Sequence, residues 1–383
     1  MATPPAPPAP AFVYTREYLD FDYGPNHPLR IDRLGMVIEL IEACGLAQPP
    51  HPVNAATTEE LAVFHDRRYL ELLKELSADP ASPDCLSYGL GSGDNPVFPG
   101  LYDWSALCCG ASLAAMRLVS QGGHQVAFNI AGGMHHALAG RAAGFCYLND
   151  PVVAAKHLVN QGRRVLYLDL DAHHGDGVQW AFYDTDQVLT MSFHQHPATL
   201  FPGTGYAEEM GRGKGRGYSV NVPLWPDCDD EIYMFAFEKI FPPVLAAFQP
   251  DYVITQLGVD TFMADPLANL NLTTRGFLHC LSLVRELCLG RWIATGGGGY
   301  HPINVARGWT AAWAVMLGRE KDLPEFLPAG FAAEHRLPAD ECRLLDVAEC
   351  VRGRFWNRSR RDAEELVKYL EDTLFPLLGA KPV

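Results

Sequence analysis

The chain has 383 residues, of which 48% are hydrophobic and 20% are charged, so it can bury a sizeable core as one large α/β domain or two smaller ones. Its net charge of −15 argues against a nucleic-acid-binding surface. No run of about 18 apolar residues occurs, which argues against a membrane span.

The ten cysteines and the N-terminus indicate the cell compartment. The cysteines show no CxxC spacing, which favours reduced thiols in a cytoplasmic protein over a disulfide framework. Residues 1–12 are rich in proline and have neither a basic region nor an apolar core, so they predict a flexible lead-in rather than a signal peptide. We therefore place a single folded domain at residues 13–383.

Apolar, β-branched runs alternate with helical patterns along the chain, which is typical of a parallel sheet with helices on both faces. Helices are expected at residues 105–120, at residues 150–162 and at about 362–378. Asp150 suits the N-cap of the second helix and Pro151 its first turn. Strands are expected at residues 125–130, 165–170, 188–193, 252–257 and 291–295. The sequence thus predicts an α/β fold with an open, mainly parallel central sheet flanked by helices.

Residues 211–217 alternate glycine with three basic residues, Arg212, Lys214 and Arg216. They either bind a phosphate or form a turn between strands. Because residues 218–222 alternate like a strand and no helical pattern follows, we expect the turn.

Polar or glycine-rich residues follow every expected strand. The segments concerned are residues 132–136, 171–177, 194–196, 258–260 and 296–300. Open parallel sheets bind ligands at the carboxyl ends of their strands, so we expect these five segments to meet at one edge of the sheet.

The densest polar segment follows the second expected strand. Its polar side chains are Asp169, Asp171, His173, His174 and Asp176. So many polar groups beside a core need compensation by hydrogen bonds or by a divalent cation. Asp171 and His173 are two residues apart and can both face such an ion, and Asp260 is the best candidate for a third ligand. Two carboxylates and one imidazole leave a position open for water, which indicates metal-assisted hydrolysis of an amide or related bond.

Three further residues suit proton transfer and oxyanion stabilisation. His135 and His136 are adjacent after two glycines, and Asp169 and Asp176 can fix their tautomers and orientation. Tyr300 follows four glycines and can bring its O–H to a developing oxyanion.

Each of these features also has a structural interpretation when it is taken alone. A histidine pair is more often structural than catalytic, Asp260 can cap a helix, and residues 296–299 can form a plain loop. We expect His194 to support the edge of the sheet and His196 to face solvent. The convergence of five segments on one edge favours the catalytic interpretation.

The motifs together resemble those of the zinc-dependent histone deacetylase family, and within it those of bacterial members such as acetoin utilization proteins. The likeness runs from about Tyr23 to past Trp313. The motifs are GMHHA at 133–137, GFCYLND at 144–150, DLDAHHGDG at 169–177, FPGTG at 201–205 and GGGGY at 296–300. Their occurrence together and in order is not a chance match, and the resemblance implies an arginase/deacetylase-like fold.

The resemblance implies one catalytic zinc ion with the ligands Asp171, His173 and Asp260. It also implies a catalytic set that comprises His135, His136, Asp169, Asp176 and Tyr300. Within this set, His136 is expected to act as general base and then as acid, and Tyr300 to help the zinc polarise an acetyl carbonyl.

The resemblance further implies a substrate tunnel and monovalent cation sites. The tunnel residues are Gly144, Phe145, Phe201 and Leu267, and Arg33 resembles the arginine of an internal cavity proposed for acetate exit. One potassium or sodium ion is expected at Asp169, Asp171, His173, Ser192 and Phe193. A second is expected at Phe182, Thr185, Val188 and Tyr218.

Departures from the family pattern bear on the partners. Pro99 stands where eukaryotic class I enzymes carry an aspartate that grips the substrate backbone. Pro266 and Ile303 replace basic residues that hold inositol phosphate, so no inositol-phosphate corepressor is expected. A homo-oligomer is compatible with the sequence.

We therefore expect a zinc-dependent amidohydrolase that removes acetyl or a similar short acyl group from lysine side chains of proteins or from a lysine-like amine. The main alternative is an acetylpolyamine amidohydrolase, which the lack of a carboxylate at the rim would favour. Two further alternatives are less favoured. A binuclear-manganese ureohydrolase needs additional metal ligands that the sequence does not offer. The complete catalytic set argues against an inactive acyl-binding protein.

Overall fold

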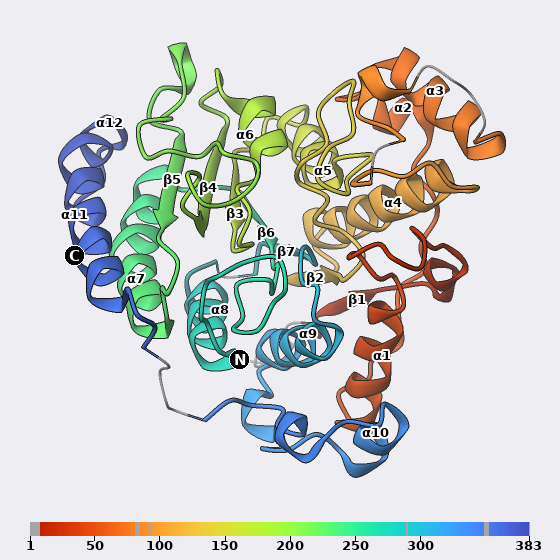
Figure 1. The fold of residues 1–383 in the computed structure, drawn as a ribbon. Helices are drawn as coiled ribbons and strands as arrows, with labels where there is room; N and C mark the ends of the chain where they lie inside the picture. The colour runs from red at the N-terminus through yellow and green to blue at the C-terminus, as the bar shows by residue number, and fades with distance from the viewer. Residues whose placement is uncertain (1–7, 81–84, 92, 289, 348–351, 383) are drawn as a thin grey trace, which may run out of the picture.

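Seven parallel strands form one open sheet in the computed structural model, which describes residues 8–80, 85–91, 93–288, 290–347 and 352–382 (Figure 1). The strands are β1 (Ala11–Val13), β2 (Val126–Asn129), β3 (Val165–Asp169), β4 (Val188–Gln195), β5 (Ser219–Leu224), β6 (Tyr252–Gln256) and β7 (Trp292–Thr295). Their order across the sheet is β1-β2-β7-β6-β3-β4-β5. The predicted open parallel sheet is confirmed.

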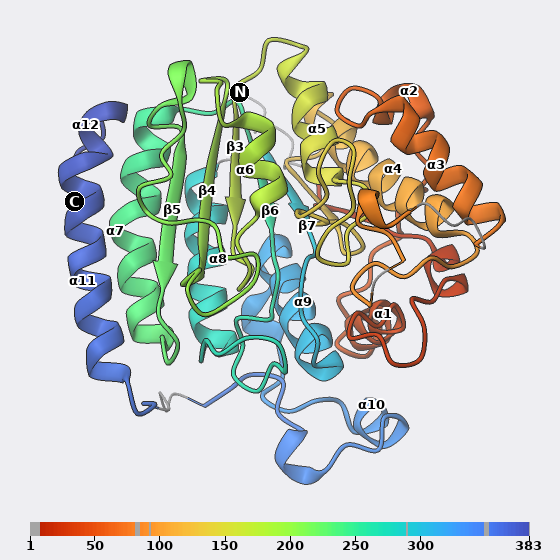
Figure 2. The same ribbon diagram turned by 45° about the horizontal axis from the view of Figure 1, so that its top comes forward.

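Helices cover both faces of the sheet because the direction of the crossovers reverses along the chain (Figure 1). One face carries α4 (Leu101–Ser120), α5 (Asp150–Val159) and α6 (Asp176–Phe182), and the other carries α7 (Asp230–Phe248), α8 (Thr274–Cys288) and α9 (Pro302–Leu317). The remaining helices are α1 (Arg33–Ala43), α2 (Thr58–Leu61), α3 (Arg67–Ala78), α10 (Ala329–Glu334), α11 (Trp356–Thr373) and α12 (Phe375–Leu378). Helix α11 lies beside α7 and β5 at the outer edge of the sheet (Figure 2).

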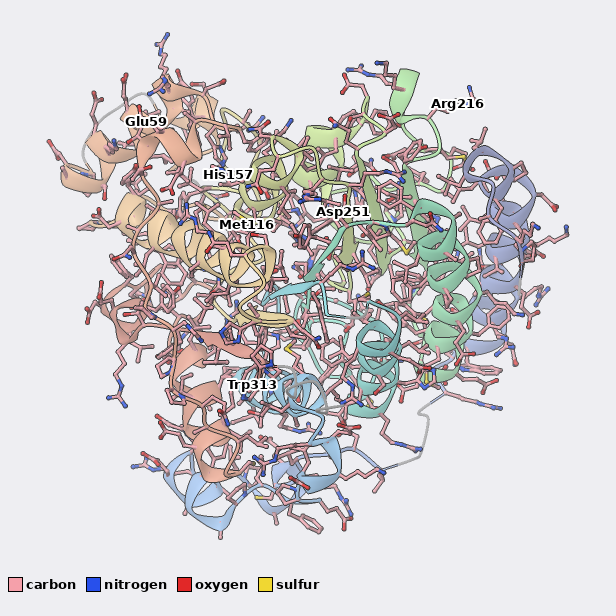
Figure 3. All side chains as sticks on the ribbon, turned by 180° about the vertical axis from the view of Figure 1, so that it is seen from behind. Glu59, Met116, His157, Arg216, Asp251 and Trp313 are labelled. Carbon is pink, nitrogen blue, oxygen red and sulfur yellow. The ribbon has the colours of Figure 1, made fainter. Side chains whose placement is uncertain are left out.

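The N-terminal part of the domain begins earlier than expected. Ala11 and Phe12 belong to β1, which pairs in parallel with β2, so they are not part of a flexible lead-in. The indole of Trp313 on α9 packs 5.0 Å from the ring of Phe12 and donates a hydrogen bond to the carbonyl of Leu46 at 3.0 Å (Figure 3). Aromatic burial of this kind holds the short edge strand in place, and local sequence patterns do not report it.

Several helix boundaries differ from those predicted, and α5 ends at Val159 rather than at residue 162. Helix α4 begins at residue 101 rather than 105, and the C-terminal helix begins at residue 356 rather than 362. Asn149, not Asp150, caps α5, since its side chain accepts a hydrogen bond from the backbone N–H of Val152. The Asp150 carboxylate turns inward instead and accepts the backbone N–H groups of Gly133 and Met134.

Residues 211–217 form a turn that leads into β5, as expected. The nine cysteines in the described ranges are free thiols, and six of them are buried. Within those same ranges, no helix combines the length and the apolar character that crossing a membrane requires.

Candidate metal centre and active site

The predicted site residues come from four strands that are neighbours in the sheet, β2, β7, β6 and β3. The tandem histidines follow β2, Asp171 and His173 follow β3, Asp260 follows β6, and Tyr300 follows β7. All four strands are parallel, so their carboxyl ends place these segments at one edge. Tertiary structure therefore brings together groups that are up to 165 residues apart in the chain, as His135 and Tyr300 are.

Asp171, His173 and Asp260 form a buried triad of possible metal ligands. Their ligand atoms all lie within 4.8 Å of one another. The Nδ1 atom of His173 lies 3.2 Å from an oxygen of Asp171 and 2.9 Å from an oxygen of Asp260. Two carboxylates and one imidazole nitrogen are a donor set that zinc accepts at catalytic sites.

The charges of this triad favour a cation at its centre. Burial raises the pKa of Asp260, and the neighbouring Asp171 raises it further, to about 7. Burial acts to lower the pKa of His173, but hydrogen bonds to Asp171 and Asp260 outweigh it and raise that pKa to about 10. Two carboxylates held together away from water are stable only with positive charge between them.

Backbone and amide donors fix the two carboxylates. Asp171 accepts hydrogen bonds from Nε2 of Gln256 at 2.6 Å and from the N–H of Gly298 at 2.8 Å, and Asp260 accepts the N–H of Ala172 at 2.8 Å. A Cβ atom on Gly298 would lie 2.2 Å from the Asp260 carboxylate, which explains why the chain needs glycine in this turn. Such outer contacts orient the ligands. Gln256 was not expected from the sequence, because a glutamine inside a strand carries no distinctive pattern.

The tandem histidines are each oriented by a carboxylate. Nδ1 of His135 donates to Asp169 at 2.8 Å, and Nδ1 of His136 donates to Asp176 at 2.7 Å. Asp169 also accepts the O–H of Tyr167 at 2.7 Å. Asp169 and Asp176 are the two partners that the sequence predicts, and the structure shows which histidine each of them orients.

The two imidazoles differ in charge. Their Nε2 atoms lie 3.0 Å apart, and two nitrogen lone pairs at that distance need a proton between them. Although burial acts to lower the pKa of His135, Asp169 and Asp171 raise it to about 9. Burial and the neighbouring His135 lower the pKa of His136 to about 4. His135 therefore carries the shared proton and His136 is neutral, so that His136 can accept a further proton.

A pocket of about 230 Å³ leads down to these groups, and we call it the tunnel. Its walls and floor are lined by Gly144, Phe145, Leu200, Phe201, Leu267, His136, His173 and Tyr300. The ring of Phe145 lies 5.6 Å from that of Tyr300, and the ring of Phe201 lies 5.1 Å from that of His136. A Cβ atom on Gly144 would come within 2.4 Å of the His136 ring, so only glycine allows this wall to approach the floor.

Tyr300 and the tunnel wall are tied together by Asp265, which the sequence analysis did not single out. The Asp265 carboxylate accepts the N–H of Tyr300 at 2.7 Å and the N–H of Leu267 at 3.0 Å. Burial and the nearby Asp260 and Asp171 raise the pKa of the Tyr300 phenol well above its usual range. The phenol therefore stays protonated and is available as a hydrogen-bond donor.

The rim of the tunnel does carry a carboxylate, contrary to the expectation drawn from Pro99. Asp94 lines the cavity together with Phe145 and Leu267. The backbone carbonyl of Asp94 lies 3.2 Å from Nε2 of His27, whose ring packs 4.7 Å from that of Phe145. The expectation of a rim without a carboxylate is therefore wrong, because a glycine- and proline-rich loop has no periodicity from which to predict which side chains reach the cavity.

Arg33 lies behind the glycine turn that precedes Tyr300. Its guanidinium donates to the carbonyl of Gly299 at 2.5 Å and to that of Gly297 at 2.8 Å, and it lies 5.1 Å from the ring of Trp309. The side chain is buried and thus supports the turn that presents Tyr300.

The segments expected to bind monovalent cations lie in two places around β4. Asp169 and Ser192 are register partners in β3 and β4, with Phe193 next along β4. Phe182 ends α6, and Thr185 lies between α6 and the start of β4 at Val188. Tyr218 directly precedes β5. Their binding of potassium or sodium stays a prediction.

Comparisons with known proteins agree with this geometry. Residues 27–316 match the family model described as histone deacetylase domain. The chain is similar to "Histone deacetylase 8" of Xenopus tropicalis, with 42% identity over 315 residues that cover 81% of this chain and 84% of the relative. It is also similar to "Histone deacetylase clr6" of Schizosaccharomyces pombe, with 38% identity over 317 residues that cover 82% of this chain and 78% of the relative.

Among solved structures, the chain resembles a histone deacetylase homologue from Aquifex aeolicus, with a TM-score of 0.84 and 36% identity over 93% of this chain and 100% of that chain. A histone deacetylase homologue complexed with SAHA gives a TM-score of 0.85 at 36% identity, over 94% of this chain and 99% of that chain. The fold is therefore of the arginase/deacetylase-like type that the motifs predict.

Proposed function

This chain belongs to the histone deacetylase family, and on that premise we propose that it removes acetyl or similar short acyl groups from lysine side chains of proteins. The observation that carries the proposal is the buried triad of Asp171, His173 and Asp260 beneath a narrow tunnel walled by two phenylalanine rings. A tunnel of this shape accepts a long, neutral side chain whose reacting group is at its end, as acetyl-lysine is.

The triad fits one zinc ion. Its two carboxylates and single imidazole are buried, and the tunnel approaches them from one side, which leaves room for water and a substrate carbonyl. When bound, zinc supplies a Lewis acid that polarises the acyl carbonyl and lowers the pKa of water.

The chain's own residues then supply proton transfer and charge stabilisation. His136 is neutral and its Nδ1–H is held by Asp176, so its only lone pair is on Nε2, which faces the N–H of His135. When the attacking water takes the place of that N–H, Nε2 accepts the proton of the water. Tyr300 donates its O–H to the oxyanion that develops on the acyl carbonyl oxygen as the carbonyl carbon is attacked. The protonated histidine pair next delivers a proton to the departing amine, and the positive charge on His135 favours the negative transition state.

Asp94 at the tunnel mouth offers an acceptor for a backbone N–H of the substrate. The acetylpolyamine alternative depended on a rim without a carboxylate. Asp94 therefore favours an acetylated polypeptide as the substrate. Side-by-side rates on an acetyl-lysine peptide and on acetylputrescine or acetylspermidine distinguish the two substrates.

The test of the catalytic assignment is the hydrolysis of a fluorogenic acetyl-lysine peptide. We expect turnover to be lost on chelation and to return with zinc, and His136→Ala to lower kcat by about 10²- to 10⁴-fold because the proton acceptor is gone. The matched control is His279→Ala, which removes a partly exposed imidazole on α8 that contacts Glu238 of α7. This variant should keep full activity. Activity that survives both chelation and His136→Ala would refute the proposal.

On the same premise we propose one or two bound potassium or sodium ions, a cytoplasmic location and no inositol-phosphate corepressor. Pro266 and Ile303, which offer no positive charge, support the last of these. Elemental analysis of the purified protein after exchange into rubidium buffer counts the monovalent ions.

A further inference from the structure

A second cavity, of about 270 Å³, opens at the same edge of the sheet as the tunnel, at the carboxyl ends of β4 and β5. We call it the outer pocket. Its aromatic walls are His196, Tyr206, Trp225 and Tyr369. Tyr369 belongs to α11, which lies alongside β5 (Figure 2).

The rings of the outer pocket are fixed in place. His196 does not simply face solvent, as we expected, but stacks on Trp225 with 4.0 Å between centroids and an interplanar angle of 10°. Tyr206 meets His196 edge-on at 5.7 Å. The backbone N–H of His196 donates to the carbonyl of Leu224 at 2.7 Å, which anchors the stack to the end of β5. A preformed set of aromatic faces results.

Three acidic residues, Glu208, Asp362 and Glu365, also line the pocket, together with the apolar residues Ala207, Pro223 and Leu366. Arg358 lies 3.4 Å from Asp362 and 5.3 Å from the Trp225 ring, so one of the chain's own guanidinium groups already uses one carboxylate and one ring of this pocket. Glu208 and Glu365 are exposed, and neither forms an ion pair with any residue in the described ranges. The pocket therefore retains negative charge beside aromatic faces, which is the environment that a guanidinium or ammonium group prefers.

One loop joins the outer pocket to the tunnel. Leu200 and Phe201 line the tunnel, whereas His196 and Tyr206 of the same loop line the outer pocket. The Glu209 carboxylate holds this loop by accepting the N–H groups of Gly205 at 3.0 Å and Tyr206 at 3.1 Å. Phe201 is five positions after His196, so their Cα atoms are at most about 18 Å apart. A polypeptide in the tunnel can thus reach the outer pocket with a residue a few positions from its acetyl-lysine.

We propose that the outer pocket binds an arginine or lysine side chain of the acetylated polypeptide, within about five residues of the acetyl-lysine. The proposal rests on the proposed function, because it assumes a polypeptide in the tunnel. Acetylation removes the charge of the target lysine, so a flanking cation is what this acidic pocket can select. Two of its carboxylates and Tyr369 lie on α11, beyond the residues 27–316 that match the family model.

The test compares acetyl-lysine peptides that differ at one position, which carries either arginine or glutamine two to five residues from the acetyl-lysine. For the best position, wild-type protein should show a KM for the arginine peptide roughly three- to tenfold lower than for the glutamine peptide, with similar kcat. The double variant Glu208→Gln/Glu365→Gln should remove this difference by raising the KM of the arginine peptide alone. Hydrolysis of a small acetyl-lysine substrate without flanking residues should be unchanged.

The matched control is Glu71→Gln/Glu75→Gln, which removes the same two negative charges from the exposed face of α3 and should keep the arginine preference. Anisotropy of a labelled arginine peptide with glutamine in place of acetyl-lysine provides a second measurement that needs no turnover. Equal KM values for the two peptides in wild-type protein, or equal losses for both peptides in the double variant, overturn the proposal. If no acetylated substrate is hydrolysed but the labelled peptide binds more weakly to the double variant, the outer pocket stands and the proposed function fails.

Discussion

The tunnel floor and the outer pocket occupy the same edge of the sheet, but the carboxylates of the floor are buried and paired whereas two of those in the outer pocket are exposed and, within the described ranges, unpaired. Asp171 and Asp260 are at most 1% exposed, and donors from the backbone, Gln256 and His173 meet their oxygens. Glu208 and Glu365 are exposed and hydrated. A buried charge costs several kcal/mol unless it is paired, whereas an exposed pair contributes about 0–1 kcal/mol. On our two proposals, bond-breaking chemistry is therefore placed where interactions are strong and prebuilt, and substrate preference where they are weak and adjustable.

The largest effect beyond loss of His136 is expected for Tyr300→Phe on the tunnel floor. Removing one oxyanion donor should lower kcat by roughly two orders of magnitude. The aromatic ring stays, so KM should change little. Because burial holds the pKa of Tyr300 well above its usual range, the variant should have the same pH profile as wild type at neutral pH. A variant as fast as wild type would remove Tyr300 from the mechanism.

A smaller effect is expected for Gln256→Met, which keeps the length of the side chain but removes the donor to Asp171. Loss of such an outer contact typically lowers metal affinity by about 10- to 100-fold. Competition between the protein and a zinc chelator measures this affinity directly. Gln161→Met, at an exposed glutamine after α5, is the control. Equal affinities in both variants would show that Gln256 does not orient the ligand.

A fall in pH should destabilise the buried region through His65, which Asn149 links to the tandem histidines. Its Nδ1 lies 3.1 Å from the carbonyl of Ala139, and its Nε2 accepts the N–H of Asn149, whose side chain donates to the carbonyl of His135. Burial lowers the pKa of His65 to about 4. Between pH 6.5 and 4 the unfolded chain binds a proton there that the folded chain excludes, so stability falls as the pH falls through this window.

From pH 7 to pH 5 this single group should lower the free energy of unfolding by about 2 kcal/mol. Urea unfolding of wild type and His65→Gln at both pH values, with chelator present, measures it. The variant should lose less stability than wild type by that amount, because the other histidines contribute equally to both. Identical losses in the two proteins would exclude His65 as the source.

The smallest effect is expected for salt, which should weaken the binding of a cationic side chain in the outer pocket and leave the reaction at the tunnel floor unchanged. Raising the ionic strength from 0.05 M to 0.5 M shortens the screening length to a few ångströms, so the KM of the arginine peptide should rise roughly threefold. The KM of a small acetyl-lysine substrate should stay constant. A parallel rise for both substrates would mean that salt acts on the whole protein rather than on the pocket.

Local sequence patterns were sufficient for the central strands and for the residues directly after them. The apolar run at residues 165–170 could only be a buried strand, and Asp171 and His173 at its end had to lie near other polar groups. Parallel topology then placed His136, Asp260 and Tyr300 at the same edge, because neighbouring strands end together. The pairing of each histidine with an aspartate followed from the need to compensate buried polar groups.

The sequence by itself thus determined the class of fold and predicted which residues the structure brings together at the carboxyl ends of the strands. Only the tertiary structure decided that Asp94 stands at the tunnel mouth, that Asn149 rather than Asp150 caps α5, that Gln256 holds Asp171 and that α11 closes the outer pocket. The physical reason is that strands and helices repeat every two or 3.6 residues and leave a local signature. A contact between Trp225 and Arg358 joins segments more than 100 residues apart, and no local period records it.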